Sequence, residues 1–184
     1  MQERVIFHVD ANSAFLSWTA AYRVRVLGES LDLRDIPSVI AGDKASRHSI
    51  ILAKSGPAKK YGIQTGEPLF QALEKCPDLV VAPPDYSLYV EASRHFVQML
   101  RQFSPMVQQY SIDEAWVDMT GTQRIFGAPR LAAEKMRQRI WEELGFTVNV
   151  GISSNKLLAK MAGDFEKPNK VHTLFPEEME SKMW

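Results

Sequence analysis

Hydrophobic and polar positions along this 184-residue chain alternate in short blocks, and these blocks predict strands separated by helices. The strand candidates are short runs rich in β-branched and aromatic residues, bounded by turn residues. They cover residues 5–9, 38–41, 49–53, 79–82, 107–110, 115–119, 147–152 and 171–174. Because strands and helices alternate along the chain, the pattern predicts an α/β or α+β fold.

Apolar residues that recur at the helical repeat predict helices in the second half of the chain. Asp85 is suited to cap the first of these helices, and Ser153 or Ser154 is suited to cap the last. Between them, a helix is predicted from Pro129 to Gly145, since proline favours the first helical turn and glycine the position past the end. The apolar sides of these helices consist of Tyr89, Phe96, Leu100 and Phe103; Leu131, Met136, Ile140 and Leu144; and Leu157, Leu158 and Met161.

The segment from about residue 27 to 84 contains more glycine and proline than the rest, which predicts a small subdomain inserted after the first strand and helix. With 45% hydrophobic and 24% charged residues, the composition is globular, and no stretch approaches the ~18 apolar residues of a membrane span. The N-terminus resembles neither a secretory signal nor a transit peptide, so a cytoplasmic location is predicted. The single Cys76 cannot form an internal disulfide, and the scattered histidines offer no zinc spacing.

The formal net charge is zero, but positive charge is concentrated in two places. Either cluster could flank an acidic centre that handles phosphate groups, or could be the solvated face of a helix, and the sequence leaves both interpretations open. The clusters consist of Lys44, Arg47, Lys54, Lys59 and Lys60, and of Lys156, Lys160, Lys167 and Lys170.

Three acidic residues stand within or directly after apolar strand patterns. Asp10 ends the first apolar run, and Asp113 and Glu114 lie between apolar positions of a later one. A carboxylate in a half-buried strand loses hydration, so it is tolerated mainly where a cation, a partner or a hydrogen-bond network compensates. Magnesium prefers oxygen ligands and is often held by carboxylates together with substrate phosphates. The three acids therefore predict a magnesium site that serves phosphate chemistry.

The surroundings of the acidic pair predict a hairpin with the acids near its bend. Adjacent residues on a strand face opposite sides, so Asp113 and Glu114 can reach one cation only if the backbone bends there. The alternative is an ordinary solvent-exposed Asp-Glu turn, which is common for such a dipeptide.

These residues also resemble the motifs of a known family, the Y-family (translesion) DNA polymerases. Residues 9–15 resemble that family's first motif, a strand that ends in a metal-binding aspartate followed by a polar and aromatic run. Residues 110–115 resemble the second motif, and residues 151–160 with 167–169 resemble the helix and lysine near the incoming triphosphate. The resemblance spans nearly the whole chain and is greatest to the UmuC-like (ImpB/MucB/SamB) branch.

The resemblance implies a role for each matching residue. Asp10, Asp113 and Glu114, with the carbonyl of Ala11, would hold two magnesium ions that assist phosphoryl transfer to a primer. Phe15 stands where the family places a steric gate that excludes the 2′-hydroxyl of ribonucleotides. A phenylalanine three positions before Trp18 on a helix is also a common core residue, so both interpretations stay open.

Residues 52–63 resemble the family's triphosphate-binding turn and helix, with Ser55 and Lys59 in the implied nucleotide site together with Lys167. Many members carry a tyrosine in place of Gly56 and an arginine in place of Lys59. A phenolic donor is thus missing, and a bidentate fork is replaced by a point charge.

The implied architecture is an α+β fold with a ferredoxin-like palm, formed by a mixed or antiparallel sheet with helices on one face. The palm would comprise residues 1–13 and 81–176, the inserted fingers 14–80, and the start of a truncated thumb 177–184. The implied partners are a DNA primer–template, deoxynucleoside triphosphates and a sliding clamp bound through a region beyond this chain; a fragment of this kind would be weakly active or inactive. A palm-fold nucleotidyl cyclase and a non-catalytic DNA-binding or regulatory module remain alternatives.

Overall fold

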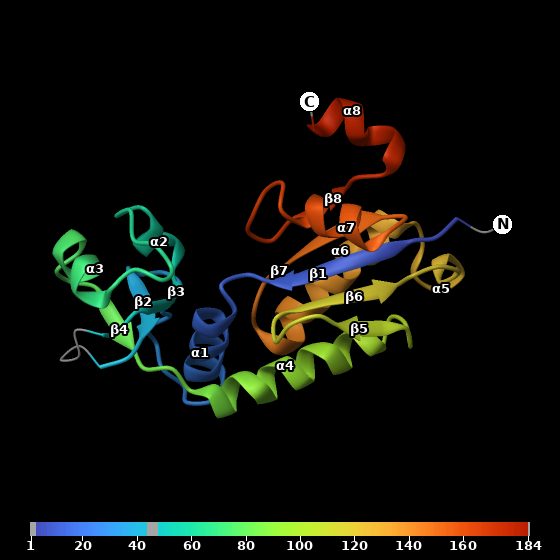
Figure 1. The fold of residues 1–184 in the computed structure, drawn as a ribbon. Helices are drawn as coiled ribbons and strands as arrows, with labels where there is room; N and C mark the ends of the chain where they lie inside the picture. The colour runs from blue at the N-terminus through green and yellow to red at the C-terminus, as the bar shows by residue number, and fades with distance from the viewer. Residues whose placement is uncertain (1–2, 44–47, 184) are drawn as a thin grey trace. The chain divides into compact units, whose positions relative to one another are not determined.

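The computed structural model describes residues 3–43 and 48–183, and the chain divides into two compact units. Unit 1 comprises Met1–Asn12 and Glu91–Trp184, and unit 2 comprises Ser13–Val90. Figure 1 shows the path of the chain through the helices and strands of each unit. The chain therefore enters unit 1, leaves it for the whole of unit 2, and returns along α4 (Tyr86–Arg101).

Unit 1 is built on a five-stranded mixed sheet with the order β5-β6-β1-β7-β8 (Figure 1). The central strand β1 pairs antiparallel with both β6 and β7, whereas β8 runs parallel to β7. The N-terminal strand thus lies between segments that are more than 90 residues distant in the sequence. The strands are β1 (Ile6–Ala11), β5 (Val107–Gln109), β6 (Glu114–Asp118), β7 (Val148–Ser153) and β8 (Val171–Thr173).

Helices of unit 1 pack on both faces of this sheet, and not on one face as the sequence analysis expected. The helix α6 packs against β7 and β8, and Ser93 of α4 donates to the carbonyl of Ile112 in the bend before β6. The helix α7 lies on the opposite face, where Gly163 approaches the ring of His8. The helical segments are α4, α5 (Gln123–Phe126), α6 (Pro129–Arg139), a π-helical turn (Ile140–Leu144), α7 (Lys156–Gly163), a 3₁₀ turn (Pro176–Glu178) and α8 (Met179–Met183).

The contact between β7 and α7 depends on a glycine. A Cβ atom added to Gly151 would lie 1.9 Å from the carbonyl oxygen of Ala159 and 2.4 Å from the backbone nitrogen of Gly163. The backbone of the helix therefore lies directly on the backbone of the strand, as only glycine permits. This close approach brings the basic residues of α7 over the face that carries His8.

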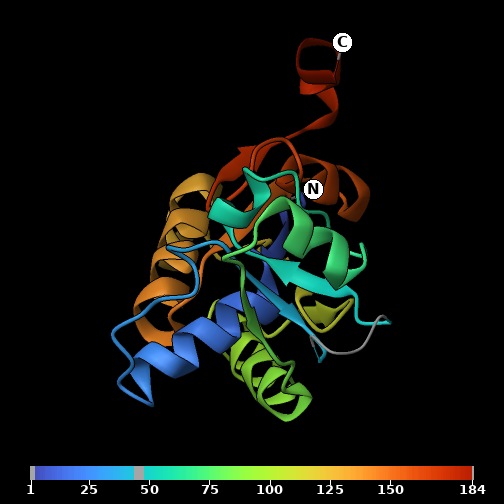
Figure 2. The same ribbon diagram turned by 90° about the vertical axis from the view of Figure 1, so that its left-hand side faces the viewer.

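Unit 2 is a three-stranded sheet, β3-β2-β4, in which β2 pairs antiparallel with β3 and parallel with β4. Two apolar clusters fill it, one around Leu16 and Ala20 of α1 and one around Ala58, Leu69 and Ala72 of α2 and α3. Figure 2 shows these helices around the small sheet. The elements are α1 (Ala14–Arg25), β2 (Ser38–Ala41), β3 (Ile51–Lys54), α2 (Gly56–Lys59), α3 (Leu69–Lys75) and β4 (Val80–Ala82).

The predicted strands are all present, with ends displaced by at most two residues. The Asp85 cap is also confirmed, because its carboxylate accepts a hydrogen bond of 3.1 Å from the backbone N–H of Leu88. The predicted caps Ser153 and Ser154 are wrong, since Asn155 caps α7 by accepting from Leu158. Leu131 and Leu157, expected on apolar helix sides, are 51% and 69% exposed.

The predicted fold class is confirmed as α+β with mixed sheets. In residues 3–43 and 48–183, none of the helices is long and apolar enough to cross a membrane. Lys44 and Arg47 of the first basic cluster, and Trp184, lie outside the described residues.

The contact at Gly151 yields a stability prediction. Replacing Gly151 with alanine should lower the free energy of unfolding by about 3 kcal/mol or more, because backbone atoms cannot yield as a flexible side chain can. Gly56→Ala is the matched control, since no atom lies within 4 Å of the added Cβ and the residue is helical. It should change stability by less than about 1 kcal/mol. Urea denaturation measures both variants, and equal effects would contradict the close packing of α7 on β7.

Candidate active site

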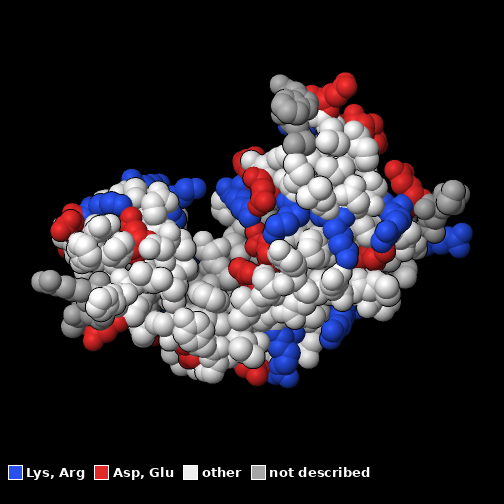
Figure 3. Space-filling model, in the orientation of Figure 1, with Lys and Arg blue, Asp and Glu red and all other residues white. Residues whose placement is uncertain are grey.

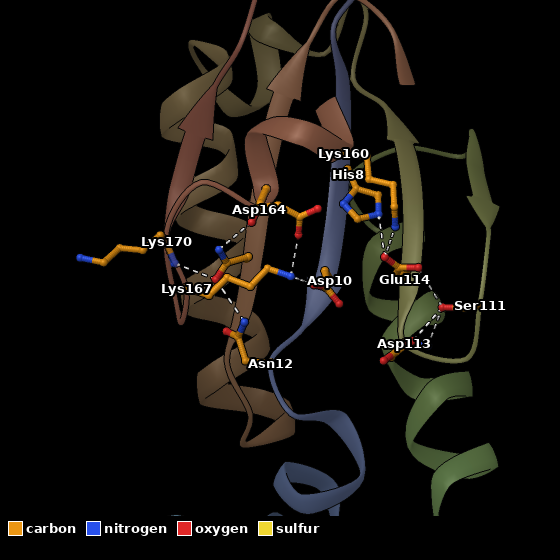
Figure 4. A network of polar contacts seen from close by, with 12 residues as sticks. His8, Asp10, Asn12, Ser111, Asp113, Glu114, Lys160, Asp164, Lys167 and Lys170 are labelled. Carbon is orange, nitrogen blue, oxygen red and sulfur yellow. Dashed lines mark hydrogen bonds and ion pairs between the residues drawn. The ribbon is translucent and has the colours of Figure 1, made fainter. Parts of the chain in front are cut away.

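The pairing of β1 with β6 brings the three acidic residues to one place in unit 1 (Figure 4). Asp10 lies directly opposite Glu114 in the antiparallel register. The next pair of the ladder is completed by the N–H of Ala11, which donates to the carbonyl of Asp113 at 3.0 Å. Asp10, Asp113 and Glu114 therefore cluster at the end of β1, as the sequence analysis expected.

The predicted hairpin is confirmed, with the acids at its bend. The strands β5 and β6 pair antiparallel, and residues 111–113 form a bend before β6 begins at Glu114. The Ser111 hydroxyl donates to Oδ1 of Asp113 at 2.7 Å and lies 3.3 Å from Oε2 of Glu114. Because both carboxylates approach one hydroxyl, the bend has brought the adjacent acids to the same side.

Two lysines are ion-paired with these carboxylates. Lys167 contacts Asp10, and its ammonium group is also 2.9 Å from Oδ1 of Asp164. Lys160, on α7, contacts Glu114. The sequence indicates Lys160 only as part of a basic cluster and gives no role to Ser111, although a serine two residues before an aspartate often forms such a turn. Figure 4 shows Lys167 extended toward Asp10 and Asp164, and Lys160 beside Glu114.

The positive charge of Lys167 does not fully compensate the burial of Asp10. Burial raises the pKa of Asp10, and the negative charges of Asp113 and Glu114 raise it further, against the hydrogen bond and charge of Lys167. For Lys167 itself, burial would lower the pKa, but the hydrogen bonds to Asp10 and Asp164 outweigh burial and raise it. The carboxylate cluster therefore favours additional positive charge.

His8 lies on β1 beside this cluster and is buried. Burial, followed by the nearby charge of Lys160, lowers the pKa of His8 to about 4, so the ring is neutral near pH 7. Its Nε2 is 3.4 Å from Oε1 of Glu114, and within the described residues neither ring nitrogen forms a hydrogen bond. The ring contributes no positive charge to the carboxylates at that pH.

The chemistry of the donor atoms suits a divalent cation, although the side chains are directed elsewhere. Within the described part of the chain, no group of three or more His, Cys, Asp or Glu side chains is arranged to hold a metal ion. The carboxylates of Asp10 and Glu114 contact lysine side chains, and the carboxylate of Asp113 contacts the Ser111 hydroxyl. The donors are nevertheless all oxygen atoms, which magnesium prefers, and Asp10 remains undercompensated. The residues present fit such an ion by their chemistry.

Phe15 lies in unit 2, in an aromatic cluster. Its ring stacks on Tyr89 with centroids 4.3 Å apart and an interplanar angle of 7°, and it contacts Trp18 and Tyr86 at 6.2 Å. The side chain is only partly buried and packs against the apolar cluster around Leu16. The packing is that of a core residue, while the intermediate burial keeps part of Phe15 exposed to solvent.

The other implied nucleotide residues of unit 2 differ in accessibility. Ser55 is 2% exposed, and its hydroxyl donates to Ile36, accepts from Ser38 and caps α2 through Ala58. These hydrogen bonds within unit 2 give Ser55 a structural role, and its implied contact with the nucleotide stays a prediction. Lys59 ends α2 and is exposed.

Each lysine of the second basic cluster contacts a polar or acidic side chain. Only some of them lie on a solvated surface away from the acidic residues. Lys156 contacts Gln108, and Lys170 is 3.4 Å from Glu166, both near the surface. Lys160 and Lys167 instead contact the candidate site. Figure 3 shows basic and acidic side chains side by side on the face of unit 1.

The fold is that of Y-family DNA polymerases, as comparison with solved structures shows. DinB from Sulfolobus solfataricus aligns with a TM-score of 0.81 and 26% sequence identity, over 96% of this chain and 50% of that protein. A Y-family DNA polymerase chimera of Dbh and Dpo4 aligns with a TM-score of 0.82 and 25% identity, again over 96% of this chain and 50% of that protein. The resemblance noted in the sequence is thereby confirmed.

The chain belongs to the impB/mucB/samB family, which it matches over residues 9–164. It is 52% identical over 181 residues to a DNA polymerase IV of Clostridium acetobutylicum, covering 98% of this chain and 45% of that relative. A DNA polymerase IV of Moorella thermoacetica is 42% identical over 178 residues, with 95% and 42% covered. The chain thus spans less than half the length of these relatives.

The ion pair between Lys167 and Asp10 yields a prediction about titration. The pKa of Asp10 should lie above its ordinary value near 3.8 and should rise further in Lys167→Met, because the cation that lowers it is removed. Lys170→Met is the matched control, since this nearby lysine pairs with Glu166. Carboxyl-carbon NMR of the chain without added metal measures the titration. An unchanged Asp10 pKa in Lys167→Met would contradict the pairing.

Proposed function

We propose that this chain contains the palm and fingers of a translesion DNA polymerase, which adds deoxynucleotides to a primer by phosphoryl transfer assisted by two magnesium ions. The observation that carries the proposal is the register of β1 and β6, which sets Asp10 opposite Glu114 with Asp113 beside them. Membership of the impB/mucB/samB family supports it. Unit 1 would be the palm, unit 2 the fingers, and residues 177–184 the start of a thumb.

In this proposal, the residues at the end of β1 bind the ions. Asp10, Asp113 and Glu114 would hold them with the carbonyl oxygen of Ala11, and Asp10 and Glu114 would exchange their lysine partners for metal. The ions would supply charge stabilisation to the attacking 3′-hydroxyl and the departing pyrophosphate. Positioning and charge balance are the main contributions a protein makes to phosphoryl transfer.

Lys167 and Lys59 would bind the triphosphate. Lys167 already lies beside Asp10 and is only partly buried, so its ammonium group can pair with a phosphate oxygen once Asp10 holds an ion. Lys59 is exposed at the end of α2. Lysine contacts phosphate as a point charge, without the bidentate fork of arginine, so we expect moderate triphosphate affinity.

The proposed partners are a DNA primer–template and deoxynucleoside triphosphates, with a sliding clamp contacted by regions beyond this chain. Among the solved structures with this fold are a ternary complex and a post-insertion binary complex of Dbh. We place the activity in the cytoplasm. The named polymerase relatives favour this function over a nucleotidyl cyclase or a non-catalytic module.

A chimera tests the proposed activity. Residues 1–184 would replace the matching region of the Clostridium acetobutylicum polymerase, and primer extension would be measured with Mg²⁺. Asp113→Ala or Glu114→Ala should lower the rate of nucleotide addition by about 100-fold or more, because charge stabilisation at the reacting phosphate is lost. Glu91→Ala is the matched control, since this exposed acid of α4 pairs only with Arg94 among the salt bridges of the described residues.

Near-normal extension by either acidic variant would refute the assignment. A second measurement does not depend on activity: electron paramagnetic resonance detects the binding of Mn²⁺ to the 184-residue chain. Asp10→Asn should weaken that binding, while Glu91→Ala should not.

The steric-gate hypothesis for Phe15 is tested in the same chimera. Phe15→Ala should raise the ratio of ribonucleotide to deoxynucleotide insertion by about tenfold or more, since removal of the ring makes room for a 2′-hydroxyl. Phe70→Ala, at a half-exposed phenylalanine of α3, is the control. An unchanged ratio together with a lower unfolding temperature would assign Phe15 to the core alone.

A further inference from the structure

The loop that presents Lys167 is held by an asparagine on the neighbouring strand. Asn149 of β7 is fully buried, with 0% of its surface exposed. Its amide nitrogen donates to the carbonyl oxygens of Gly163, at 2.9 Å, and Glu166, at 2.7 Å. Both carbonyls belong to the segment between the end of α7 and Lys167. One buried amide therefore ties the start of this loop to the central sheet.

The oxygen of the same amide holds the other end of the loop. It accepts a hydrogen bond of 3.3 Å from the backbone N–H of Lys170 and one of 3.1 Å from the side chain of Asn12. The amide of Asn149 can make about four hydrogen bonds, and these contacts use all of them. Asn149 thus fixes the backbone on both sides of Lys167, within four residues in either direction.

A second asparagine extends the contact toward the candidate site. Asn12 follows β1 directly, and its side-chain oxygen accepts from the N–H of Asn169 at 2.9 Å and from the hydroxyl of Thr147 at 3.0 Å. Asn169 adopts a left-handed backbone conformation with φ of 62°, and its side chain accepts from Arg137 at 2.7 Å. The turn after Lys167 is therefore fixed to the strand that carries Asp10.

We propose that Asn149 is a positioning residue for Lys167, holding residues 163–170 so that the ammonium group of Lys167 faces a phosphate ligand at Asp10. The inference rests on the proposed function, because it assumes that Lys167 contacts the triphosphate. Lysine has a long, flexible side chain, and ordering it costs conformational entropy. A rigid backbone limits the positions that the ammonium group can reach, which reduces the cost of binding an anion.

Holding residues 163–170 in this way requires the side-chain amide of Asn149. Two carbonyl oxygens and two N–H groups converge on Asn149, so a neutral group with two donors and an acceptor is required. Aspartate has nearly the same shape but only acceptors when ionised, and would direct an oxygen at the carbonyls of Gly163 and Glu166. Serine is neutral but offers a single donor, so it can retain at most one of those contacts.

The test uses the 184-residue chain with dATP and Mg²⁺, and measures dATP affinity by equilibrium dialysis. Asn149→Asp should weaken the affinity at least about fivefold, because a small displacement of a charged contact is costly. Amide hydrogen exchange should become faster in residues 163–170. Asn149→Ser, a neutral change, should act in the same direction if Asn149→Asp proves unstable. Ser104→Ala is the matched control, since this buried hydroxyl fixes a different loop by donating to Asp118 and accepting from Met106.

The Lys167→Ala background separates positioning from other effects. If Asn149 acts through Lys167, Asn149→Asp should cause no further loss of dATP affinity once Lys167 is alanine. An equal loss in both backgrounds would mean that the added charge alone repels the nucleotide, and would overturn the inference. Unchanged affinity or unchanged exchange in the Asn149 variants, with weaker binding in Lys167→Ala, would also overturn it while leaving the proposed function intact. No effect of Lys167→Ala itself would remove the phosphate role of Lys167, and this inference with it.

Discussion

The antiparallel pairing of β1 with β6 and β7 is the constraint on which the candidate site depends. In this register Asp10 faces Glu114 on one side and Asn149 on the other. A slip of one residue would turn Asp10, His8 and Ile6 to the opposite face of the sheet. The buried residues Phe7 and Val9 oppose such a slip, because it would move them from their own core face to the face that carries His8 and is covered by α7. Packing of the core and placement of the acids are thus fixed by the same ladder.

Charge balance links the sheet to the helix above it. Burial raises the pKa of Asp10, and the negative charges of Asp113 and Glu114 raise it further. Lys167, in the loop after α7, offsets part of this effect, and Lys160 of α7 pairs with Glu114. The lysines reach the acids because Gly151 lets α7 approach β7 at backbone distance. Gly151, which has no side chain, therefore affects the electrostatics of the site by letting the lysines come close.

The sequence predicted what local periodicity determines and missed what tertiary packing determines. The strands and the bend at Asp113 follow from alternation and from the need for two adjacent acids to share a side. The cap of α7 could not be read from the sequence, because Ser153, Ser154 and Asn155 are all suitable. Pairing of Ser153 with Ile6 extends the strand and moves the cap to Asn155. Likewise, the sequence does not reveal that the Ser55 hydroxyl already forms hydrogen bonds with the backbone of Ile36 and Ser38.

The insertion of unit 2 between β1 and the rest of unit 1 has a consequence for biosynthesis. Unit 2 is continuous in the sequence, so it can fold as soon as it leaves the ribosome, whereas β1 emerges first and must wait for both of its neighbours. At about 5–20 residues per second, more than 100 further residues take several seconds or longer to translate. During that interval the apolar segment Val5–Val9 has no native partner, and a nascent chain in this state is a natural client for a chaperone.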